Sequence, residues 1–283
     1  MKVLSLFDGI SCGLQSLKET NIKVEKYYSS EIDKNAIKIS NKNHPEIIRL
    51  GDVNSIDFDN FKNIDLLLAG SPCQGFSTQG KGLGFEDNRS VLFYKFIEAL
   101  KIIKPKYFLL ENVKMKNEWL NIIDKEVGIK RYFLSSSHFS AQDRRRYYWT
   151  NIDFDKNNIK DKNLNFKDIE DKSADNYFNE NRIEDLKNKS WNQTKTYILN
   201  SEKYMKSKFP TLWGANMCPG NVPFIKKDDK YRLLTILECE RLQTLPDNYT
   251  YFEDLSNNDR YRTITNGWNV ATINHILSGI IKK

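Results

Sequence analysis

The first 150 residues alternate short apolar runs with stretches that show helical spacing. The helical stretches lie at residues 11–20, 33–42 and 88–103. Asp33 is the expected N-terminal cap of the second stretch. The apolar runs predict strands at residues 3–7, 26–30, 47–50, 65–69, 107–110, 131–134 and 147–150. Strands that alternate with helices in this way are typical of an α/β fold with a doubly wound, mostly parallel sheet.

The pattern changes after Asn151. The next 50 residues are rich in Asn, Lys, Asp and Glu with weak periodicity, and a cluster of Pro and Gly follows between residues 210 and 223. From Tyr231 the helical spacing returns, and the last stretch, 268–281, is amphipathic. We therefore predict a main domain over residues 1–151, a small irregular region over 152–230, and a C-terminal segment over 231–283 that returns to the main domain.

The composition supports a folded core, because 39% of the 283 residues are hydrophobic. No apolar run approaches the ~18 residues that a membrane span needs. The apolar stretch after Lys2 is too short for a secretory signal, and Asp8 follows it at once. We therefore expect a cytoplasmic location and no membrane partner.

The charges and the cysteines narrow the classes of function. The chain carries 44 Lys and Arg against 37 Asp and Glu, and this net charge of +7 is compatible with a polyanionic partner. The four cysteines form no Cys-x-x-Cys pair, and the three histidines are dispersed. We expect neither a disulfide framework nor a metal site.

Polar residues follow five of the predicted strands directly. The carboxyl ends of parallel strands meet at one edge of such a sheet, where ligands bind. The sequence therefore predicts one cleft that is lined by these residues: Asp8, Glu31, Asp52, the pair Pro72-Cys73, and Glu111.

Three of these strand ends favour a nucleoside ligand. The turn over residues 7–13 has glycines for close ligand approach, but it lacks both G-x-G-x-x-G and the P-loop pattern. Glu31 suits a ribose diol, and an equally good interpretation is a helix-capping acid. Asp52 suits an adenine amino group, or serves as a turn residue after Gly51. Together they indicate a nucleoside that is bound without a phosphate cradle.

The other strand ends carry reactive groups. Cys73 follows Pro72 at a strand exit, although a free cysteine is more often a small buried hydrophobe. The next loop, 78–88, holds three glycines and can close as a lid. Glu111 places a carboxyl at the neighbouring strand end, where it can act as an acid. Arg144 and Arg146 are alternate residues of an extended segment, so both can point inward, or they form a solvated basic patch.

In these motifs the sequence resembles the DNA (cytosine-5)-methyltransferases. The Trp268 variant of the last motif and the short variable region are most like the small branch that holds phage enzymes and animal de novo methyltransferases. The motifs occur in the family's order: the turn at 7–13, Glu31, Asp52, Pro72-Cys73-Gln74, Glu111-Asn112-Val113, Gln142-x-Arg144-x-Arg146, Leu233-Leu234-Thr235-x-x-Glu238-x-x-Arg241-Leu242-Gln243 and Gly267-Trp268-Asn269-Val270.

The resemblance implies a Rossmann-like fold that uses S-adenosylmethionine, with a target-recognition domain over residues 152–230. It implies that Cys73 adds to C6 of a flipped-out cytosine in double-stranded DNA, helped by Glu111, Arg144 and Arg146. The implied cofactor contacts are Phe7, Asp8, Gly9, Ser11, Gly13, Glu31, Ile32, Asp52, Val53, Pro72, Leu92, Trp268, Asn269 and Val270.

Several alternatives stay open at the level of the sequence. One branch of the family methylates tRNA, and an inactive DNA-binding or scaffold paralogue would keep the fold without the reaction. A restriction endonuclease partner or a second copy of the chain is compatible with the resemblance, and so is a prokaryotic or phage-infected host cell. Thr235 and Glu238 predict a capping box on a helix to Gln243, in which Arg241 is structural.

Overall fold

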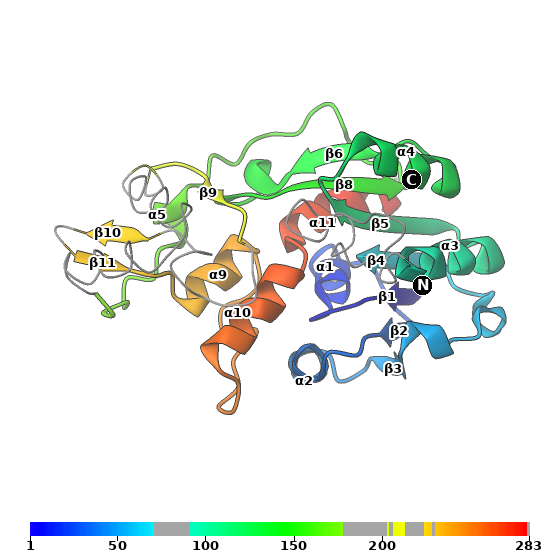
Figure 1. Cartoon of the computed structure of the whole chain (residues 1–283), viewed down its shortest axis with the longest axis horizontal. Helices are drawn as coiled ribbons and strands as arrows, with labels where there is room; N and C mark the ends of the chain where they lie inside the picture. Colours follow the sequence, from blue (N-terminus) through cyan, green and yellow to red (C-terminus); the bar gives the residue numbers. More distant parts are fainter. Residues whose placement is uncertain (71–90, 178–202, 204–205, 213–223, 228–229, 282–283) are drawn as a thin grey trace. The chain divides into compact units, whose positions relative to one another are not determined.

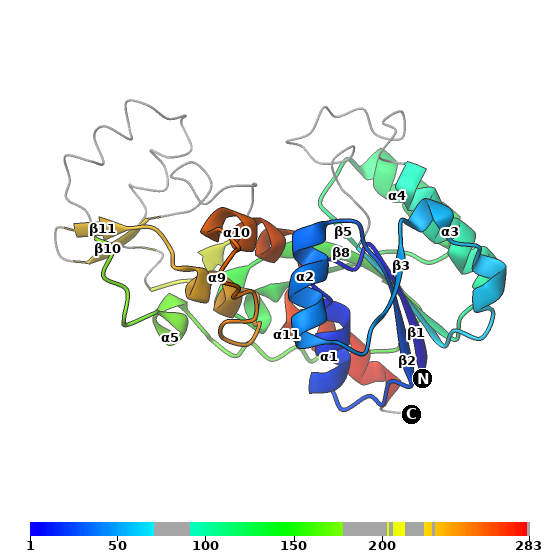
Figure 2. The same ribbon diagram turned by 90° about the horizontal axis from the view of Figure 1, so that it is seen from below.

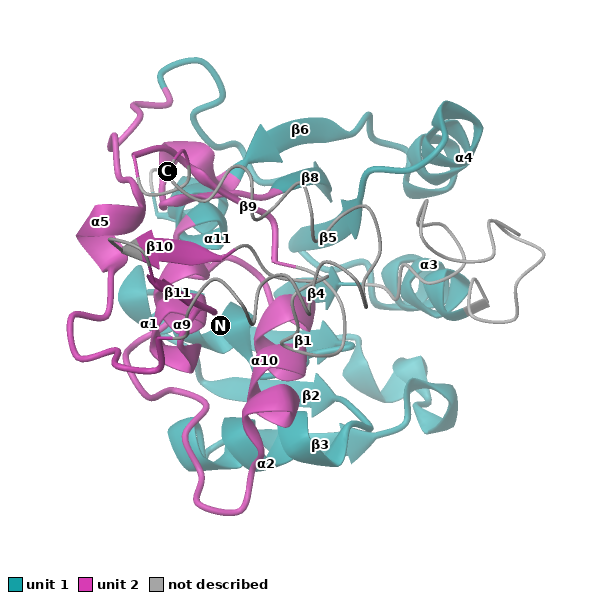
Figure 3. Cartoon of the chain, turned by 60° about the vertical axis from the view of Figure 1, so that its left-hand side comes forward, with its two compact units in different colours: residues 1–135, 145–158, 272–283 teal, residues 136–144, 159–271 magenta. Residues whose placement is uncertain are grey.

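The computed structural model describes residues 1–70, 91–177, 203, 206–212, 224–227 and 230–281. The chain divides into two compact units (Figure 3). The first holds residues 1–135, 145–158 and 272–283, and the second holds residues 136–144 and 159–271. None of the described helices is long and apolar enough to cross a membrane.

The first unit is built on one seven-stranded sheet in the order β3-β2-β1-β4-β5-β8-β6 (Figure 1). Neighbours among β1 to β5 pair in parallel, and β8 pairs antiparallel with both β5 and β6. The strands are β1 (Lys2–Leu6), β2 (Lys26–Ser30), β3 (Ile48–Gly51), β4 (Leu66–Gly70), β5 (Tyr107–Val113), β6 (Tyr132–Ser135) and β8 (Arg145–Thr150).

Helices cover both faces of this sheet. Figure 2 shows α1, α2 and α11 on one face and α3 and α4 on the other. The helices are α1 (Cys12–Glu19), α2 (Lys34–Asn43), α3 (Val91–Ile103), α4 (Asn117–Val127) and α11 (Val270–Leu277), with 3₁₀ turns at Val53–Ser55, Phe58–Phe61 and Ser278–Ile280. The predicted fold class, a doubly wound and mostly parallel α/β sheet, is confirmed.

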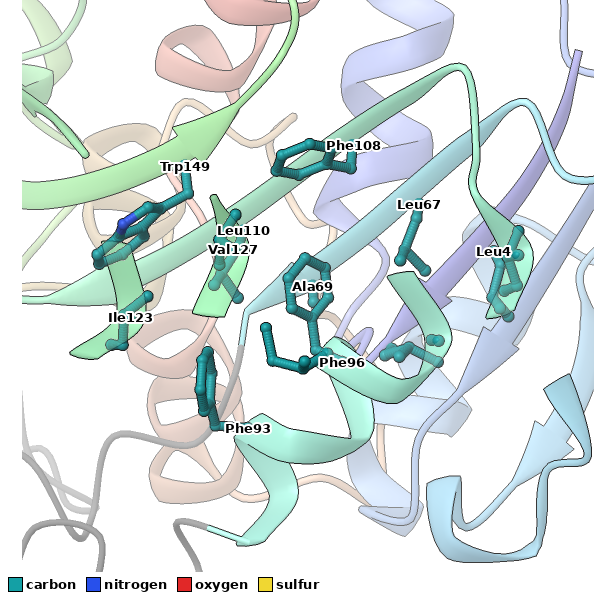
Figure 4. Close-up of a cluster of buried hydrophobic side chains, with 14 of the residues drawn as sticks. Leu4, Leu67, Ala69, Phe93, Phe96, Phe108, Leu110, Ile123, Val127 and Trp149 are labelled. Carbon is teal, nitrogen blue, oxygen red and sulfur yellow. The ribbon is translucent and has the colours of Figure 1, made fainter. Parts of the chain in front are cut away.

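The apolar runs explain why the sheet lies at the centre. The side chains of Leu4, Leu67 and Ala69 are fully buried, as a parallel sheet with two covered faces requires. On the face of α3 and α4, Phe96 packs in the same core cluster as Trp149 of β8 (Figure 4). This packing fixes the strand ends that carry the candidate site.

Five predicted strands lie within one residue of their observed bounds, but β5 and β8 are longer than predicted. β5 continues to Val113, so Glu111 lies inside the strand, and the prediction that it follows the strand end is wrong. The cause is β8, whose antiparallel pairing continues the ladder from Glu111 to Val113. The predicted cap of α2 is correct, because Asp33 accepts hydrogen bonds from the amides of Asn35 and Ala36.

The second unit is made of short elements. Its strands are β7 (Gln142–Asp143), β9 (Phe209–Pro210), β10 (Ile225–Lys227) and β11 (Lys230–Arg232), paired as β7-β9 and β10-β11. Among the described residues of this unit, the helices are α5 (Phe166–Ile169), α9 (Ile236–Leu242) and α10 (Asn257–Asn266), with a 3₁₀ turn at Ser136–His138. The capping box of Thr235 and Glu238 is present on α9 as predicted. The assignment of target recognition to residues 152–230 stays a prediction.

Candidate functional site

The turn between β1 and α1 has an unusual backbone. Phe7, Gly9 and Ser11 have φ values of 57°, 56° and 61°. A left-handed residue other than glycine costs roughly 1–2 kcal/mol, so the surrounding contacts must hold Phe7 and Ser11 in place. Around Gly9, no described atom lies within 4 Å of the position where a Cβ would stand. The turn is therefore tight, and the space beside Gly9 is open to a ligand.

Glu31 connects the end of β2 to this turn. Its Oε2 accepts a hydrogen bond of 2.7 Å from the amide of Gly9, and its Oε1 accepts bonds of 2.8 Å from the amides of Ile32 and Asp33. These bonds link the turn after β1 to the residues that precede α2, whose N-terminal cap is Asp33 and not Glu31. Ribose binding by Glu31 stays a prediction. The neighbouring Ile32 is 70% exposed, which leaves an apolar surface next to the carboxylate.

Asp8 points into the protein. Its Oδ1 accepts a hydrogen bond of 2.7 Å from the hydroxyl of Tyr27, and its Oδ2 accepts from Ser29 at 2.8 Å and from Ser11 at 2.5 Å. Burial, followed by the charge of Asp8, raises the pKa of Tyr27 well above its ordinary value. Asp8 and Ser11 thus stabilise the turn through hydrogen bonds on its protein-facing side.

This network continues to α2 and β3. The Ser11 hydroxyl also contacts that of Ser40, and Arg49 donates to Ser40 at 2.6 Å and to Ser29 at 3.1 Å. No motif in the sequence points to these residues. The available signal was the pair Ser29-Ser30 at the buried end of a strand, because buried polar groups need partners.

The other predicted cofactor residues of the first unit differ in exposure. Asp52 is exposed and caps the 3₁₀ turn at Val53–Ser55, where its Oδ1 accepts from the amide of Asn54 at 2.9 Å. Val53 belongs to the buried core, and Leu92 packs against that core. Gly13 is buried in α1. Pro72 and Cys73 lie outside the described residues, as does the predicted lid at 78–88.

The reacting end holds an ion pair between two strands. Arg146 Nε of β8 lies 2.9 Å from Glu111 Oε1 of β5, and the two side chains are 12% and 10% exposed. Glu111 is also the register partner of Gly70, the last residue of β4. The chain that leaves β4 toward Cys73 therefore starts beside this pair.

Arg144 does not lie on β8 with Arg146. It stands between β7 and β8 and belongs to the second unit, whereas Arg146 belongs to the first. Its Nη2 donates to the carbonyls of Thr265 at 3.1 Å and Gly267 at 2.9 Å, and Arg144 is 5% exposed. The prediction that the two arginines share one face stays untested.

The last predicted cofactor segment follows α10 in the second unit. Asn269 Nδ2 donates to the carbonyl of Leu242 at 3.0 Å, and the amide of Val270 donates to the carbonyl of Gln243 at 3.0 Å. Trp268 is half-buried, whereas Asn269 and Val270 are buried. Within the described parts of the chain, no three His, Cys, Asp or Glu side chains gather as a metal site.

A model of the family described as C-5 cytosine-specific DNA methylase matches residues 1–282. The chain belongs to this family. The orphan methyltransferase M.Rho11sI of Bacillus phage rho11s is 41% identical over 161 residues, which cover 52% of this chain and 32% of that protein. The type II methyltransferase M1.ScrFI of Lactococcus lactis subsp. cremoris is 28% identical over 313 residues, covering 99% of this chain and 78% of that protein.

Solved structures support the fold of this family member. The S. pombe Dnmt2 methyltransferase has a TM-score of 0.72 and 17% identity, and the match covers 100% of this chain and 98% of that one. The matches to two phage relatives, M.Rho11sI and M.SPRI of Bacillus phage SPR, span only 32% and 41% of those proteins. Because these matches are partial, family membership rests on the family model that matches residues 1–282.

Two residues of the family motif on α9 contact the backbone of residues 169–171 in the second unit. Glu238 Oε1 accepts a hydrogen bond of 2.9 Å from the amide of Asp171, and Arg241 Nη1 donates to the carbonyls of Ile169 and Glu170 at 3.2 and 3.3 Å. Both motif residues therefore hold residues 169–171, which lie within the region predicted to recognise the target. These contacts agree with the structural role predicted for Arg241.

Proposed function

We propose that this methylase transfers a methyl group from S-adenosylmethionine to C5 of a flipped-out cytosine in double-stranded DNA. The observation that carries the proposal is the pair of Glu111 and Arg146 beside the exit of β4, in a chain whose family match covers residues 1–282. This ion pair joins two family motifs that are distant in the sequence, and it lies next to the strand that leads to the Pro-Cys motif.

The residues at the other strand ends fit the cofactor. The open space beside Gly9 admits a ligand close to the backbone, and the exposed Ile32 offers an apolar surface for an adenine ring. Glu31 accepts three backbone hydrogen bonds, and a carboxylate has about four acceptor sites, so one site remains for a ribose hydroxyl. When bound, S-adenosylmethionine supplies the methyl group.

The reaction needs a nucleophile because C5 of cytosine reacts poorly by itself. The Cys73 thiolate adds to C6, and the electron pair of the C5–C6 double bond then makes C5 nucleophilic. C5 would take the methyl group, with S-adenosylhomocysteine as the leaving group. A base removes the proton from C5, the double bond forms again, and the C6–S bond breaks. A cytosine within a duplex is inaccessible to this sequence of steps, so the base must leave the stack.

Glu111 and Arg146 assist this addition. Glu111 holds a proton at N3 of the base, which withdraws electrons from the ring while the sulfur adds. Arg146 orients the Glu111 carboxyl through the contact of 2.9 Å and retains N–H groups that can donate to the base O2. Target choice lies in residues 152–230, because sequence readout needs a surface separate from the chemistry.

The test combines a mechanistic trap with a choice of substrate. Duplex DNA that contains 5-fluorocytosine should form a stable adduct with the wild-type chain and S-adenosylmethionine, because fluorine at C5 cannot leave as a proton. We expect Cys73→Ser to form no adduct and to lose at least ~1000-fold in turnover, about 4 kcal/mol of barrier. Its affinity for S-adenosylhomocysteine should stay that of the wild type, because the thiol acts on the base.

Three outcomes would contradict the proposal. Turnover by Cys73→Ser above one part in a thousand would contradict the covalent step. Faster turnover of tRNA than of duplex DNA would contradict the DNA substrate, and no methylation of either would favour an inactive paralogue. Bisulfite sequencing of DNA from a host that expresses the chain would then give the methylated site.

A further inference from the structure

Two family motifs meet at the C-terminal end of α10. Arg144, from the Gln-x-Arg-x-Arg motif, donates through Nη2 to the carbonyls of Thr265 and Gly267. Gln243, from the Arg-Leu-Gln motif, donates through Nε2 to the carbonyl of Ile264 at 3.2 Å. All these residues belong to the second unit, and the segment that follows is Trp268-Asn269-Val270.

The end of a helix needs such donors, because its last carbonyls have no partner within the helix. The amide of Gly267 bonds to the carbonyls of Thr263 and Ile264, and Arg144 takes the carbonyl of Thr265. A guanidinium is a permanent cation, which the negative end of a helix dipole favours. By contacting Thr265 within α10 and Gly267 just after it, Arg144 fixes the direction in which the chain leaves the helix.

The next residues are fixed from α9 as well. Asn269 and the amide of Val270 both donate to carbonyls at the end of α9, those of Leu242 and Gln243. Gln243 therefore contacts the segment through both its side chain and its backbone. The backbone from Gly267 to Val270 is held at both ends, while Trp268 between them keeps part of its surface exposed.

We propose that Arg144 is a positioning residue for the nucleoside cofactor and does not touch the cytosine. It holds the segment over residues 267–270 in the conformation that binds the cofactor, and Gln243 assists from the neighbouring helix. The proposal rests on the proposed function and on the contacts of Trp268, Asn269 and Val270 with S-adenosylmethionine that the family resemblance implies. It divides the two arginines of one motif, since Arg146 is paired with Glu111 in the first unit and acts on the base.

The test measures cofactor affinity without DNA and without turnover. Calorimetry with S-adenosylhomocysteine compares the wild type with Arg144→Lys, Arg144→Gln, Gln243→Met and Arg146→Gln. We expect Arg144→Gln to weaken binding at least tenfold and Arg144→Lys to lie between it and the wild type, because an ammonium lacks the planar fork of Arg. Gln243→Met should cause a smaller loss, and Arg146→Gln should stay within twofold of the wild type.

A matched control separates positioning from a general loss of stability. Ser256 caps the opposite end of α10, where its Oγ accepts from the amide of Asp259 at 3.1 Å. Ser256→Ala should lower the melting temperature and leave the affinity for S-adenosylhomocysteine within twofold of the wild type. If it weakens binding as much as Arg144→Gln does at an equal loss of Tm, the proposal is wrong.

The remaining outcomes also decide. If the wild type binds S-adenosylhomocysteine and Arg144→Gln binds it equally well, Arg144 does not position the cofactor segment, and the proposed function stands without this inference. If Arg144→Gln fails to fold, Arg144→Lys and Gln243→Met carry the same comparison. If the wild type does not bind S-adenosylhomocysteine, the proposed cofactor is wrong and this proposal falls with it.

Discussion

The ion pair of Arg232 and Glu238 in the second unit joins the same chemical groups as the pair of Glu111 and Arg146 in the first. Arg232 contacts both carboxylate oxygens of Glu238 at 2.7 Å, and the two side chains are 1% and 0% exposed. Glu238 also accepts from the amides of Asp171 and Thr235, each at 2.9 Å. Four donors use all the acceptor sites of that carboxylate, so it has no capacity left for a substrate.

The pair in the first unit is more open. Arg146 Nε lies 2.9 Å from Glu111 Oε1, and about a tenth of each side chain is exposed. It lies where β4 ends, whereas Glu238 lies on a helix whose cap and neighbours consume its carboxylate. The two pairs thus differ in exposure and in their place in the fold, and the following predictions test whether they also differ in function.

Glu238→Gln should have the largest effect on stability. The substitution keeps the shape and removes the charge, which leaves the buried Arg232 guanidinium only the more distant carboxylate of Glu170, at 3.8 Å. Breaking a buried pair in this way costs up to about 3–5 kcal/mol. We expect a large drop in the urea midpoint, measured by circular dichroism. Turnover should fall only as far as the folded fraction falls.

A control for this prediction is Asp247→Asn. Asp247 is also bound in a bidentate way, by Arg241 at 2.8 and 2.6 Å, but its side chain is 49% exposed. Exposed pairs contribute less than about 1 kcal/mol, so Asp247→Asn should barely move the midpoint. Equal destabilisation by the two variants would contradict the closed character of the Glu238 pair.

Glu111→Gln should lower turnover strongly and the urea midpoint only slightly, the reverse of what Glu238→Gln should do. An amide cannot hold the proton at N3, so we expect kcat to fall at least ~100-fold, about 2.7 kcal/mol of barrier. The urea midpoint should shift less than in Glu238→Gln, because solvent reaches the pair. Measurement of kcat, of the midpoint and of cofactor affinity decides this, and a variant with normal kcat would remove Glu111 from the reaction.

The sheet could be predicted from the sequence because its central strands are almost wholly apolar. Leu4 of β1 and Leu67 of β4 belong to continuous runs that allow only a doubly covered sheet. The extension of β5 could not be predicted, since residues 111–113 are partly polar and depend on an antiparallel partner more than thirty residues later. The contact of Glu111 with Arg146 depends on the same register, so the motifs named both residues and not their pairing.

The direction of the side chains in the turn between β1 and α1 could not be predicted from the sequence either. Asp8 follows β1 and was predicted to face the ligand, but its carboxylate accepts hydrogen bonds from Tyr27, Ser29 and Ser11. The positive φ of Phe7 redirects the chain just before Asp8, and a sequence pattern carries no signal for such a residue. Glu31, by contrast, lies where the alternation of strands and helices placed it, directly after β2.

Glu31→Ala should have the smallest of these effects, on cofactor affinity. Glu31 is intermediate between the two ion pairs, because three backbone amides bind its carboxylate and one acceptor site remains. Loss of a charged hydrogen bond to a ribose hydroxyl should weaken S-adenosylhomocysteine by about 1.5–3 kcal/mol, which calorimetry measures. The substitution also frees the Gly9 amide, so the Tm of the unliganded protein must be measured alongside.

A ligand analogue without the 2′-hydroxyl separates the two roles of Glu31, ribose binding and stabilisation of the turn. The analogue should bind the wild type more weakly than S-adenosylhomocysteine does, and Glu31→Ala should bind both alike. If the variant discriminates between them as strongly as the wild type, Glu31 only shapes the turn, and its carboxylate is as closed as that of Glu238.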